Sequence, residues 1–406
     1  MTPLHYACQK YGVIISEPLS DIPKSEETHS YKIPIKLLKP HKSISPPVAL
    51  IEGGHRYEAW ESAKLLVKWG ANVNAVDQSA KTPLLYASDE VEHLHFLINH
   101  GANINAKNGV HGRTLLHTFL EQEKAPALIQ FLLEHGANPN LVIEDKKLSP
   151  LHIASKQYGN FETVKLLINF GANINALDIE MKTPLHYAAM TVGASESVKG
   201  LLRMGAKIDA VDNAGKTPLH YTIDDEAFRF QIAHGANINA MDNNHETFLH
   251  QAVAACKPLP YITFLVQQGA NINAVNSKGM APLHYAAREF GTEKIARFFV
   301  KQGAYIDVKD NKGMSPLHYA AGHSLGFQMV KCLIELGARP QAFDDNQRTP
   351  LHYAAKISGG LDIIQYLIQH GAQFNLRDAL GQTPLGIALD AKNLEVSSFL
   401  KRLEGK

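Results

Sequence analysis

The sequence predicts an all-α repeat solenoid, a stack of helix-turn-helix units from which hairpin-like loops project. The first observation is the motif Thr-Pro-Leu-His, which stands intact at Thr2, Thr183, Thr217 and Thr349. The second is its spacing, because Thr183 and Thr217 are 34 residues apart and later copies keep this period. A fixed period of this length is typical of small units that each pack against the next.

Altered copies of the motif bring the number of units to eleven. Successive copies begin 30 to 35 residues apart, except for a first gap of 80 residues between Thr2 and Thr82. The altered copies begin at Thr82, Thr114, Ser149, Thr247, Ala281, Ser315 and Thr383.

Residues 178–211 show how one unit is built. Thr183 is a suitable helix N-cap, with its hydroxyl accepting a backbone N–H, and Pro184 fits the first helical position. Apolar residues at helical spacing predict a short first helix and then a second helix, which Gly205 ends in a left-handed conformation. The polar, turn-rich segment 206–216 predicts a projecting loop that resembles a β-hairpin.

The chain closely resembles the ankyrin-repeat family over nearly its whole length. Besides the repeated Thr-Pro-Leu-His, the sequence Gly-Ala-Asn-(Ile/Val)-Asn-Ala begins at Gly70, Gly101, Gly171, Gly235 and Gly269. The resemblance implies an ankyrin-repeat stack over 1–406, with paired helices side by side and β-hairpin loops projecting at right angles. It also implies that partners bind a concave surface made of hairpin tips and first helices.

The long first gap contains a proline-rich insertion at 13–58 within the first repeat. Residues 1–12 match the start of a unit and residues 59–70 match its end, so the insertion splits that unit. Its prolines preclude a long helix, and acidic residues near its start are followed by lysines. We expect either a tolerated loop or lid, or a docking arm. The candidate contact residues of such an arm are Lys32, Lys36 and Lys39.

The last unit, 383–406, is expected to cap the stack. Gly386 stands where most units have histidine. The final helix is expected to turn Ser397, Ser398, Lys401 and Arg402 outward, because a solenoid must end in a polar face.

Composition argues against several classes of ligand. The 40 lysines and arginines almost balance the 39 aspartates and glutamates, whereas nucleic acid and anionic membranes select a concentrated basic surface. No apolar run is long enough to insert into a membrane and no signal peptide is evident. The three scattered cysteines fit a reducing compartment, so we expect a cytoplasmic monomer.

The 21 histidines invite a metal or catalytic interpretation, but their periodicity favours a structural one. Rings that recur one unit apart lie in a row and do not converge on one point. No nucleotide-binding, hydrolase or metalloprotease motif is present. We therefore expect no enzyme, catalytic residue, cofactor or metal site. The periodic histidines are His5, His117, His152, His186, His220, His250, His284, His318 and His352.

The leading functional prediction is a non-enzymatic scaffold that binds a protein partner on the concave surface. Fixed residues build the stack, and varied residues are free to specify a ligand. The varied candidates are Lys156, Ile179, Glu180, Met190, Asn213, Asn243, Asn244, Asn276, Ser277, Arg288, Asn311, Lys312, Asp345, Asn346 and Lys356.

Two alternatives remain open. The chain could be an effector or regulatory protein whose specific contact is made by 13–58, in the manner of asparagine-rich arrays that bacteria or viruses deliver into a host cytosol. Hairpin asparagines such as Asn105, Asn175 or Asn239 could also be substrates of an asparaginyl hydroxylase, as in some members of the family that the chain resembles.

Overall fold

The structure is a computed structural model. It describes residues 60, 63–64, 67–68, 70–76, 80–87, 90–109, 111–157 and 160–405. The insertion at 13–58, with Lys32, Lys36 and Lys39, lies outside the described residues, as do the first Thr-Pro-Leu-His copy and His5.

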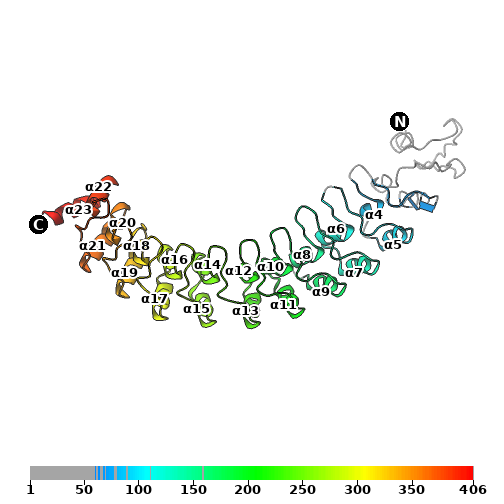
Figure 1. The fold of residues 1–406 in the computed structure, drawn as a ribbon, viewed down its shortest axis with the longest axis horizontal. Helices are drawn as coiled ribbons and strands as arrows, with labels where there is room; N and C mark the ends of the chain where they lie inside the picture. The colour runs from blue at the N-terminus through cyan, green and yellow to red at the C-terminus, as the bar shows by residue number, and fades with distance from the viewer. Residues whose placement is uncertain are drawn as a thin grey trace, which may run out of the picture. The chain divides into compact units, whose positions relative to one another are not determined.

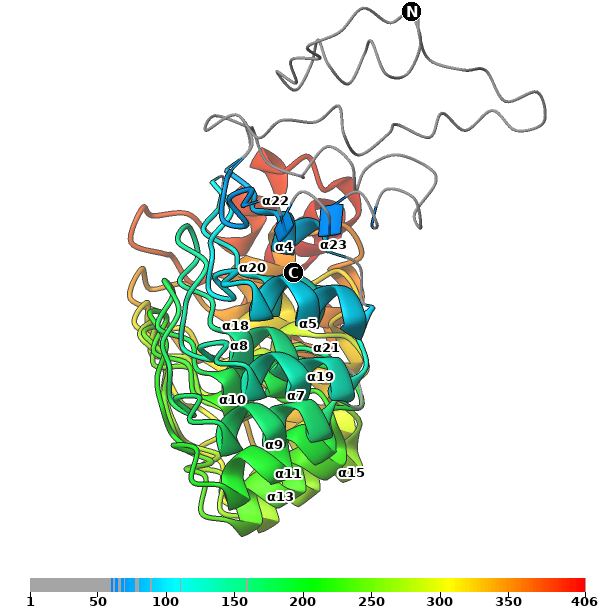
Figure 2. The same cartoon turned by 90° about the vertical axis from the view of Figure 1, so that its right-hand side faces the viewer.

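The chain divides into two compact units, Met1–Lys207 and Ile208–Lys406. Within each unit the repeats alternate a first and a second helix. The first helices of successive repeats pack side by side in one row and the second helices in another (Figure 1). The connecting hairpin loops extend to one side of these rows (Figure 2). This arrangement confirms the helical repeat fold that the sequence predicts.

In the first unit, the first helices are α4 (Pro83–Tyr86), α6 (Leu115–Glu121), α8 (Pro150–Ser155) and α10 (Pro184–Ala189). The second helices are α5 (Val91–Asn99), α7 (Pro126–Glu134), α9 (Phe161–Asn169) and α11 (Ser195–Arg203).

In the second unit, the first helices are α12 (Pro218–Tyr221), α14 (Phe248–Ala254), α16 (Pro282–Arg288), α18 (Pro316–Ala321), α20 (Pro350–Lys356) and α22 (Pro384–Asp390). The second helices are α13 (Asp225–Ala233), α15 (Leu259–Gln267), α17 (Glu293–Lys301), α19 (Phe327–Glu335), α21 (Leu361–Gln369) and α23 (Leu394–Glu404).

The ends of the helices follow the sequence signals. Thr183 is the N-cap of α10 and closes a capping box with His186, and Pro184 occupies the first helical turn. Leu185, on the face toward the core, is fully buried. Gly205 follows α11 with φ +95°, the left-handed conformation that ends a helix without a Cβ penalty. These features confirm the predicted start and end of this helix pair.

The projecting hairpins are held mainly by side-chain hydrogen bonds to their own backbone. Asp310 pairs its backbone N–H with the Met314 carbonyl at 3.0 Å, and its Oδ1 accepts the N–H groups of Lys312 and Met314, each at 2.9 Å. Among the described residues, β-pairing appears only as isolated bridges, Ile143 with Leu148 and Met241 with Thr247. The loops therefore have the course of hairpins without extended strands.

In five of the described repeats the motif histidine makes a hydrogen bond to the next repeat. In α18, Nδ1 of His318 accepts the backbone N–H of Ser315 at 3.0 Å and lies 2.9 Å from its hydroxyl. Because Nδ1 accepts a hydrogen bond, the ring proton lies on Nε2, which donates to the Arg348 carbonyl of the following hairpin at 3.1 Å. Equivalent Nε2 contacts are made by His152, His250, His284 and His352.

Burial keeps these rings neutral, since it lowers the pKa of His318 and of its counterparts. At His117 burial lowers the pKa from 6.5 to about 4. The hydrogen bonds and the neutral state confirm the predicted structural role for His152, His250, His284, His318 and His352, whereas Nε2 of His117 and of His220 is buried and has no hydrogen-bond partner among the described residues.

A second joint uses the last asparagine of the Gly-Ala-Asn-Ile-Asn motif. Asn239 donates from Nδ2 to the Gly269 carbonyl at 2.9 Å and accepts the Asn271 N–H through Oδ1 at 2.8 Å. One amide thus satisfies a donor and an acceptor of the next repeat. Asp209 stands at the equivalent position and accepts the Asn237 N–H at 3.1 Å, but a carboxylate has no N–H for the next glycine carbonyl.

The last repeat differs from the prediction in one residue. Ser398, Lys401 and Arg402 are exposed on α23, as expected. Ser397 is buried, because it lies on the helical stripe of Val396 and Leu400 that packs inward. A hydroxyl that bonds its own helix, here the Leu394 carbonyl at 3.2 Å, can occupy such a position.

We predict that the protein loses stability as the pH falls from about 6.5 to about 4. The unfolded chain takes up a proton near the ordinary histidine pKa of 6.5, whereas folded His117 does so only near 4. Stability therefore rises with pH across this window and is independent of this ring above it. At about 1.4 kcal/mol per pKa unit, His117 alone accounts for roughly 3 kcal/mol.

Melting temperatures between pH 7.5 and 4.5 test this. The His117→Leu variant places at this position the residue that Leu85 supplies in another unit. This variant should be less stable than the original protein at pH 7.5, but its melting temperature should fall less on acidification. The same loss in both proteins would contradict the assignment.

We predict opposite effects from exchanging amide and carboxylate at the second joint. Asn239→Asp removes the donor to the Gly269 carbonyl and should cost about 1 kcal/mol, whereas Asp209→Asn supplies a missing donor and should stabilise by a similar amount. Urea unfolding measures both changes. Asn244→Asp, an exposed tip residue, is the control with the same charge change. A loss as large in the control would show that charge, and not the joint, is responsible.

Candidate functional site

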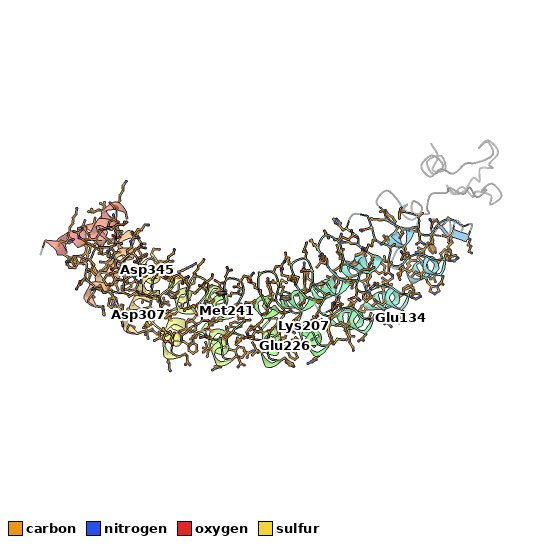
Figure 3. The ribbon with its side chains drawn as sticks, in the orientation of Figure 1. Glu134, Lys207, Glu226, Met241, Asp307 and Asp345 are labelled. Carbon is orange, nitrogen blue, oxygen red and sulfur yellow. The ribbon has the colours of Figure 1, made fainter. Side chains whose placement is uncertain are left out.

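Within each unit, the exposed ends of the hairpins and of the first helices form the candidate site, here called the hairpin-tip surface of that unit. In the second unit, Asp345 lies on the hairpin side of the helices and Glu226 on the second-helix side (Figure 3). Most of the predicted contact residues are exposed on this surface. At the tips they are Ile179, Glu180, Asn213, Asn243, Asn244, Ser277, Asn311, Lys312, Asp345 and Asn346.

The predicted contacts on the first helices lie where these helices end. Lys156 and Lys356 are exposed at the ends of α8 and α20, and Arg288 is exposed at the end of α16. Met190, which follows α10, is half-buried.

Asn276 does not fit the predicted contact role, because it is buried. It stands where the other hairpins of this unit have the turn-forming aspartate, and its Oδ1 accepts the N–H groups of Lys278 at 2.9 Å and Met280 at 3.0 Å. Its Nδ2 donates to the Tyr285 hydroxyl at 2.9 Å. The sequence places it at a tip, but all its polar atoms face the protein.

Neighbouring tips are tied together by their backbones. The N–H of Asn311 donates to the Lys278 carbonyl at 2.9 Å, and that of Asp345 donates to the Lys312 carbonyl at 3.0 Å. Asn311 adds a bond from Nδ2 to the Ser277 carbonyl at 2.9 Å. The tips are therefore spaced by hydrogen bonds, and part of the predicted asparagine set serves this spacing.

Tyrosines of the first helices fix the hairpins from the helical side. The hydroxyl of Tyr319 donates to Asp310 Oδ2 at 2.6 Å, and that of Tyr353 donates to Asp344 Oδ2 at 2.6 Å. Burial, and then the hydrogen bond to the carboxylate, raise the pKa of Tyr319. The phenol stays protonated, so each hairpin is held to its own repeat by a charge-assisted bond.

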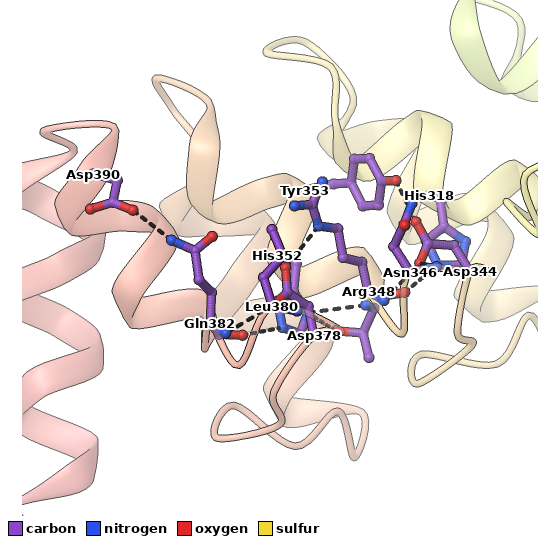
Figure 4. Close-up of polar contacts among 11 residues, drawn as sticks. His318, Asp344, Asn346, Arg348, His352, Tyr353, Asp378, Leu380, Gln382 and Asp390 are labelled. Carbon is purple, nitrogen blue, oxygen red and sulfur yellow. Dashed lines mark hydrogen bonds and ion pairs between the residues drawn. The ribbon is translucent and has the colours of Figure 1, made fainter.

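A further contact crosses from one hairpin to the next in two forms. Arg348 donates from Nε to Asp378 Oδ2 at 3.0 Å (Figure 4). Burial opposes the charge of Asp378, but bonds from Arg348 and from backbone N–H groups lower its pKa. At the equivalent place Glu246 accepts from the Tyr285 hydroxyl, and Asn276 replaces the aspartate. In this pair of hairpins the carboxylate is on the earlier hairpin, at Glu246, and the later hairpin has an amide, at Asn276. Two carboxylates therefore do not face each other.

The described residues contain no cluster of three or more histidine, cysteine, aspartate or glutamate side chains suited to hold a metal. His93 instead lies 3.2 Å from Glu90 and packs on Trp60, with ring centroids 3.9 Å apart. Within the same part of the chain, no helix has the length and apolar character to cross a membrane.

One exposed position of the hairpin was not among the predicted contacts, namely the residue directly before the turn-forming acid or amide. In the second unit it holds Val211, Met241 and Val275, which are 56%, 46% and 46% exposed, and then Lys309. The available signal was their variation between units beside a fixed neighbour, because these side chains alternate with the inward-facing Asp or Asn.

Comparison with family models identifies the repeat. A model of three ankyrin repeats matches residues 96–178, 116–212, 185–276, 254–344 and 324–405, and a single ankyrin-repeat model matches residues 81–109. No curated protein matches the sequence.

We predict that Asn276→Asp destabilises the protein by about 1–2 kcal/mol, because it places a second carboxylate beside Glu246. Adding Glu246→Lys should restore stability by creating the cation–aspartate contact seen between Arg348 and Asp378. Urea unfolding of the single and double variants gives their coupling free energy. Additive effects would show that Glu246 and Asn276 do not interact.

Proposed function

The chain belongs to the ankyrin-repeat family, and from this premise we propose that it is a non-enzymatic scaffold that binds a protein partner on its hairpin-tip surface. Ankyrin repeats are generally protein–protein interaction modules. The observation that carries the proposal for this chain is the division of labour within each repeat. Motif residues are buried and bonded to their neighbours, whereas the tips present exposed residues that differ from repeat to repeat.

The geometry of the tips supports binding by a preformed surface. Turn-forming acids such as Asp310, the tyrosine bonds and the tip-to-tip backbone bonds all hold the hairpins before any ligand arrives. A surface that is already ordered loses little conformational entropy on association, so more of the contact energy appears as affinity.

The setting that we propose is cytoplasmic and the state monomeric. Cys256 and Cys332 are both free thiols, which suits a reducing compartment. The near balance of acidic and basic residues disfavours nucleic acid as the main ligand.

The alternative is an effector or regulatory protein whose specific contact is made by 13–58, including Lys32, Lys36 and Lys39. It rests on the sequence of a segment outside the described residues. Deletion of 13–58 separates the two proposals, because the hairpin-tip surface is retained in that variant.

We predict that Asn244→Arg combined with Asn346→Arg abolishes capture of the native partner from cells and leaves the melting temperature unchanged. Both residues are exposed at tips, where an arginine adds bulk and charge to the interface. Gln268→Arg with Gln302→Arg is the matched control, because both glutamines are exposed where α15 and α17 end.

The captured protein is then purified and its affinity for each variant is measured directly. Unchanged affinity of the tip variant, together with loss of binding after deletion of 13–58, would transfer the site to the insertion.

A further inference from the structure

The hairpin-tip surface of the second unit changes character along the stack. The residue before the turn-forming acid or amide is apolar in three successive hairpins, at Val211, Met241 and Val275. The tip residues of the first two of these hairpins are uncharged: Asn213 and Ala214 in one, and Asn243 and Asn244 in the other. From the hairpin of Asn276 onward, exposed cations appear at several positions.

Lys278 and Lys312 occupy the same place in consecutive tips, 34 residues apart, and both are exposed. Lys309 and Arg377 are exposed directly before Asp310 and Asp378. Lys356 adds a cation at the end of α20. In the part of the chain that the structure describes, none of these five side chains lies within ion-pair distance of a carboxylate.

The acids of the same hairpins are engaged elsewhere. Asp310 and Asp344 are buried and accept bonds from tyrosine hydroxyls and backbone N–H groups, and Asp378 receives Arg348. Asp345 is the exposed acid among these tips. The solvent side of this stretch therefore presents lysine and arginine charges that internal carboxylates do not pair.

The spacing of Lys278 and Lys312, which occupy one place in consecutive tips, selects a ligand conformation. Stacked helices lie about 8–10 Å apart, so equivalent side chains of consecutive repeats are separated by about that distance. A polyproline II helix has three residues per turn and rises about 3.1 Å per residue, so every third residue returns to the same face after about 9 Å. In a β-strand, residues three apart point to opposite faces.

We propose that this stretch, from the tip of Lys278 to that of Arg377, binds an extended acidic peptide in polyproline II conformation, with carboxylates at every third residue. Apolar residues flanking the acidic segment would reach the row of Val211, Met241 and Val275. The inference rests on the proposed scaffold function and names the chemistry of the partner at that same surface.

The test measures binding of two fluorescent peptides of identical composition to the full chain by anisotropy. In the first, Glu-Pro-Pro is repeated four times, so the glutamates share one face. In the second peptide, four Glu-Pro pairs precede four prolines, so the four glutamates do not all lie on one face of a polyproline II helix. The first peptide should bind more tightly, and added salt should weaken it because the contacts are exposed.

Charge reversal locates the site. Lys278→Glu with Lys312→Glu should weaken the first peptide at least about tenfold, since each change turns an attraction into a repulsion. Lys294→Glu with Lys301→Glu makes the same change in net charge at exposed positions of α17, on the second-helix side, and should alter binding less than about twofold. Unchanged melting temperatures confirm that both variants fold.

Three results would overturn the proposal: no binding of the first peptide, equal binding of both peptides, or equal loss in both variant pairs. A rise in affinity after deletion of 13–58 would assign the site to the chain's own acidic residues between Glu17 and Glu27 and overturn an external partner. Loss of the native partner in the Asn244 and Asn346 variant, without peptide binding, would leave the scaffold function standing and remove only the acidic ligand.

Discussion

The hydrogen bonds of one imidazole ring are the constraint on which the rest of this structure depends. The ring accepts from the N-cap of its own first helix and donates to a carbonyl of the following hairpin, as His318 does between Ser315 and Arg348. Helix start, hairpin position and repeat spacing are therefore fixed by a single side chain. The ring can do this only while neutral, and its burial between repeats keeps it so.

Other polar contacts, which lie nearer the surface, also satisfy backbone groups and fix the hairpins. The asparagine joint satisfies the glycine carbonyl exposed at the end of five of the second helices, and the tyrosine bond holds the hairpin over its own helix. Since these groups are satisfied internally, the tips are free to vary without leaving buried polar atoms unpaired. Cationic tips such as Lys278 and Lys312 can therefore coexist with a nearly neutral chain.

What the sequence could predict was decided by the range of the interactions involved. The cap at Thr183, the left-handed Gly205 and the histidine row depend on neighbours within one repeat or on strict periodicity, and all three were predicted correctly. Asn276 and Ser397 were placed on the wrong side, because their orientation depends on a tyrosine hydroxyl and on a helical stripe. The carboxylate of this contact is on Glu246 and the amide is on Asn276. The two residues are 30 apart in the sequence, so no local pattern reveals their contact. The contact surface itself stays a proposal, since variation at the tips indicates freedom to bind and not the identity of what is bound.

The repeat that begins at Thr217 is followed by the next motif copy after 30 residues instead of the usual 34, and this shortening has a consequence for how such a chain can evolve. There α12 is a single turn, yet Nδ1 of His220 still accepts the Thr217 N–H and Asp212 still holds its hairpin. The missing residues lie between the first and second helices, and Nε2 of His220, the atom that reaches the next hairpin in other repeats, has no hydrogen-bond partner in the part of the chain that the structure describes. Selection acting on such a chain can remove or add residues at that point, or duplicate whole repeats, without losing the start of the first helix, although the bond from its histidine to the next hairpin is not kept in this repeat. Lineages can thus change the length of the stack and the chemistry of the hairpin-tip surface in separate steps.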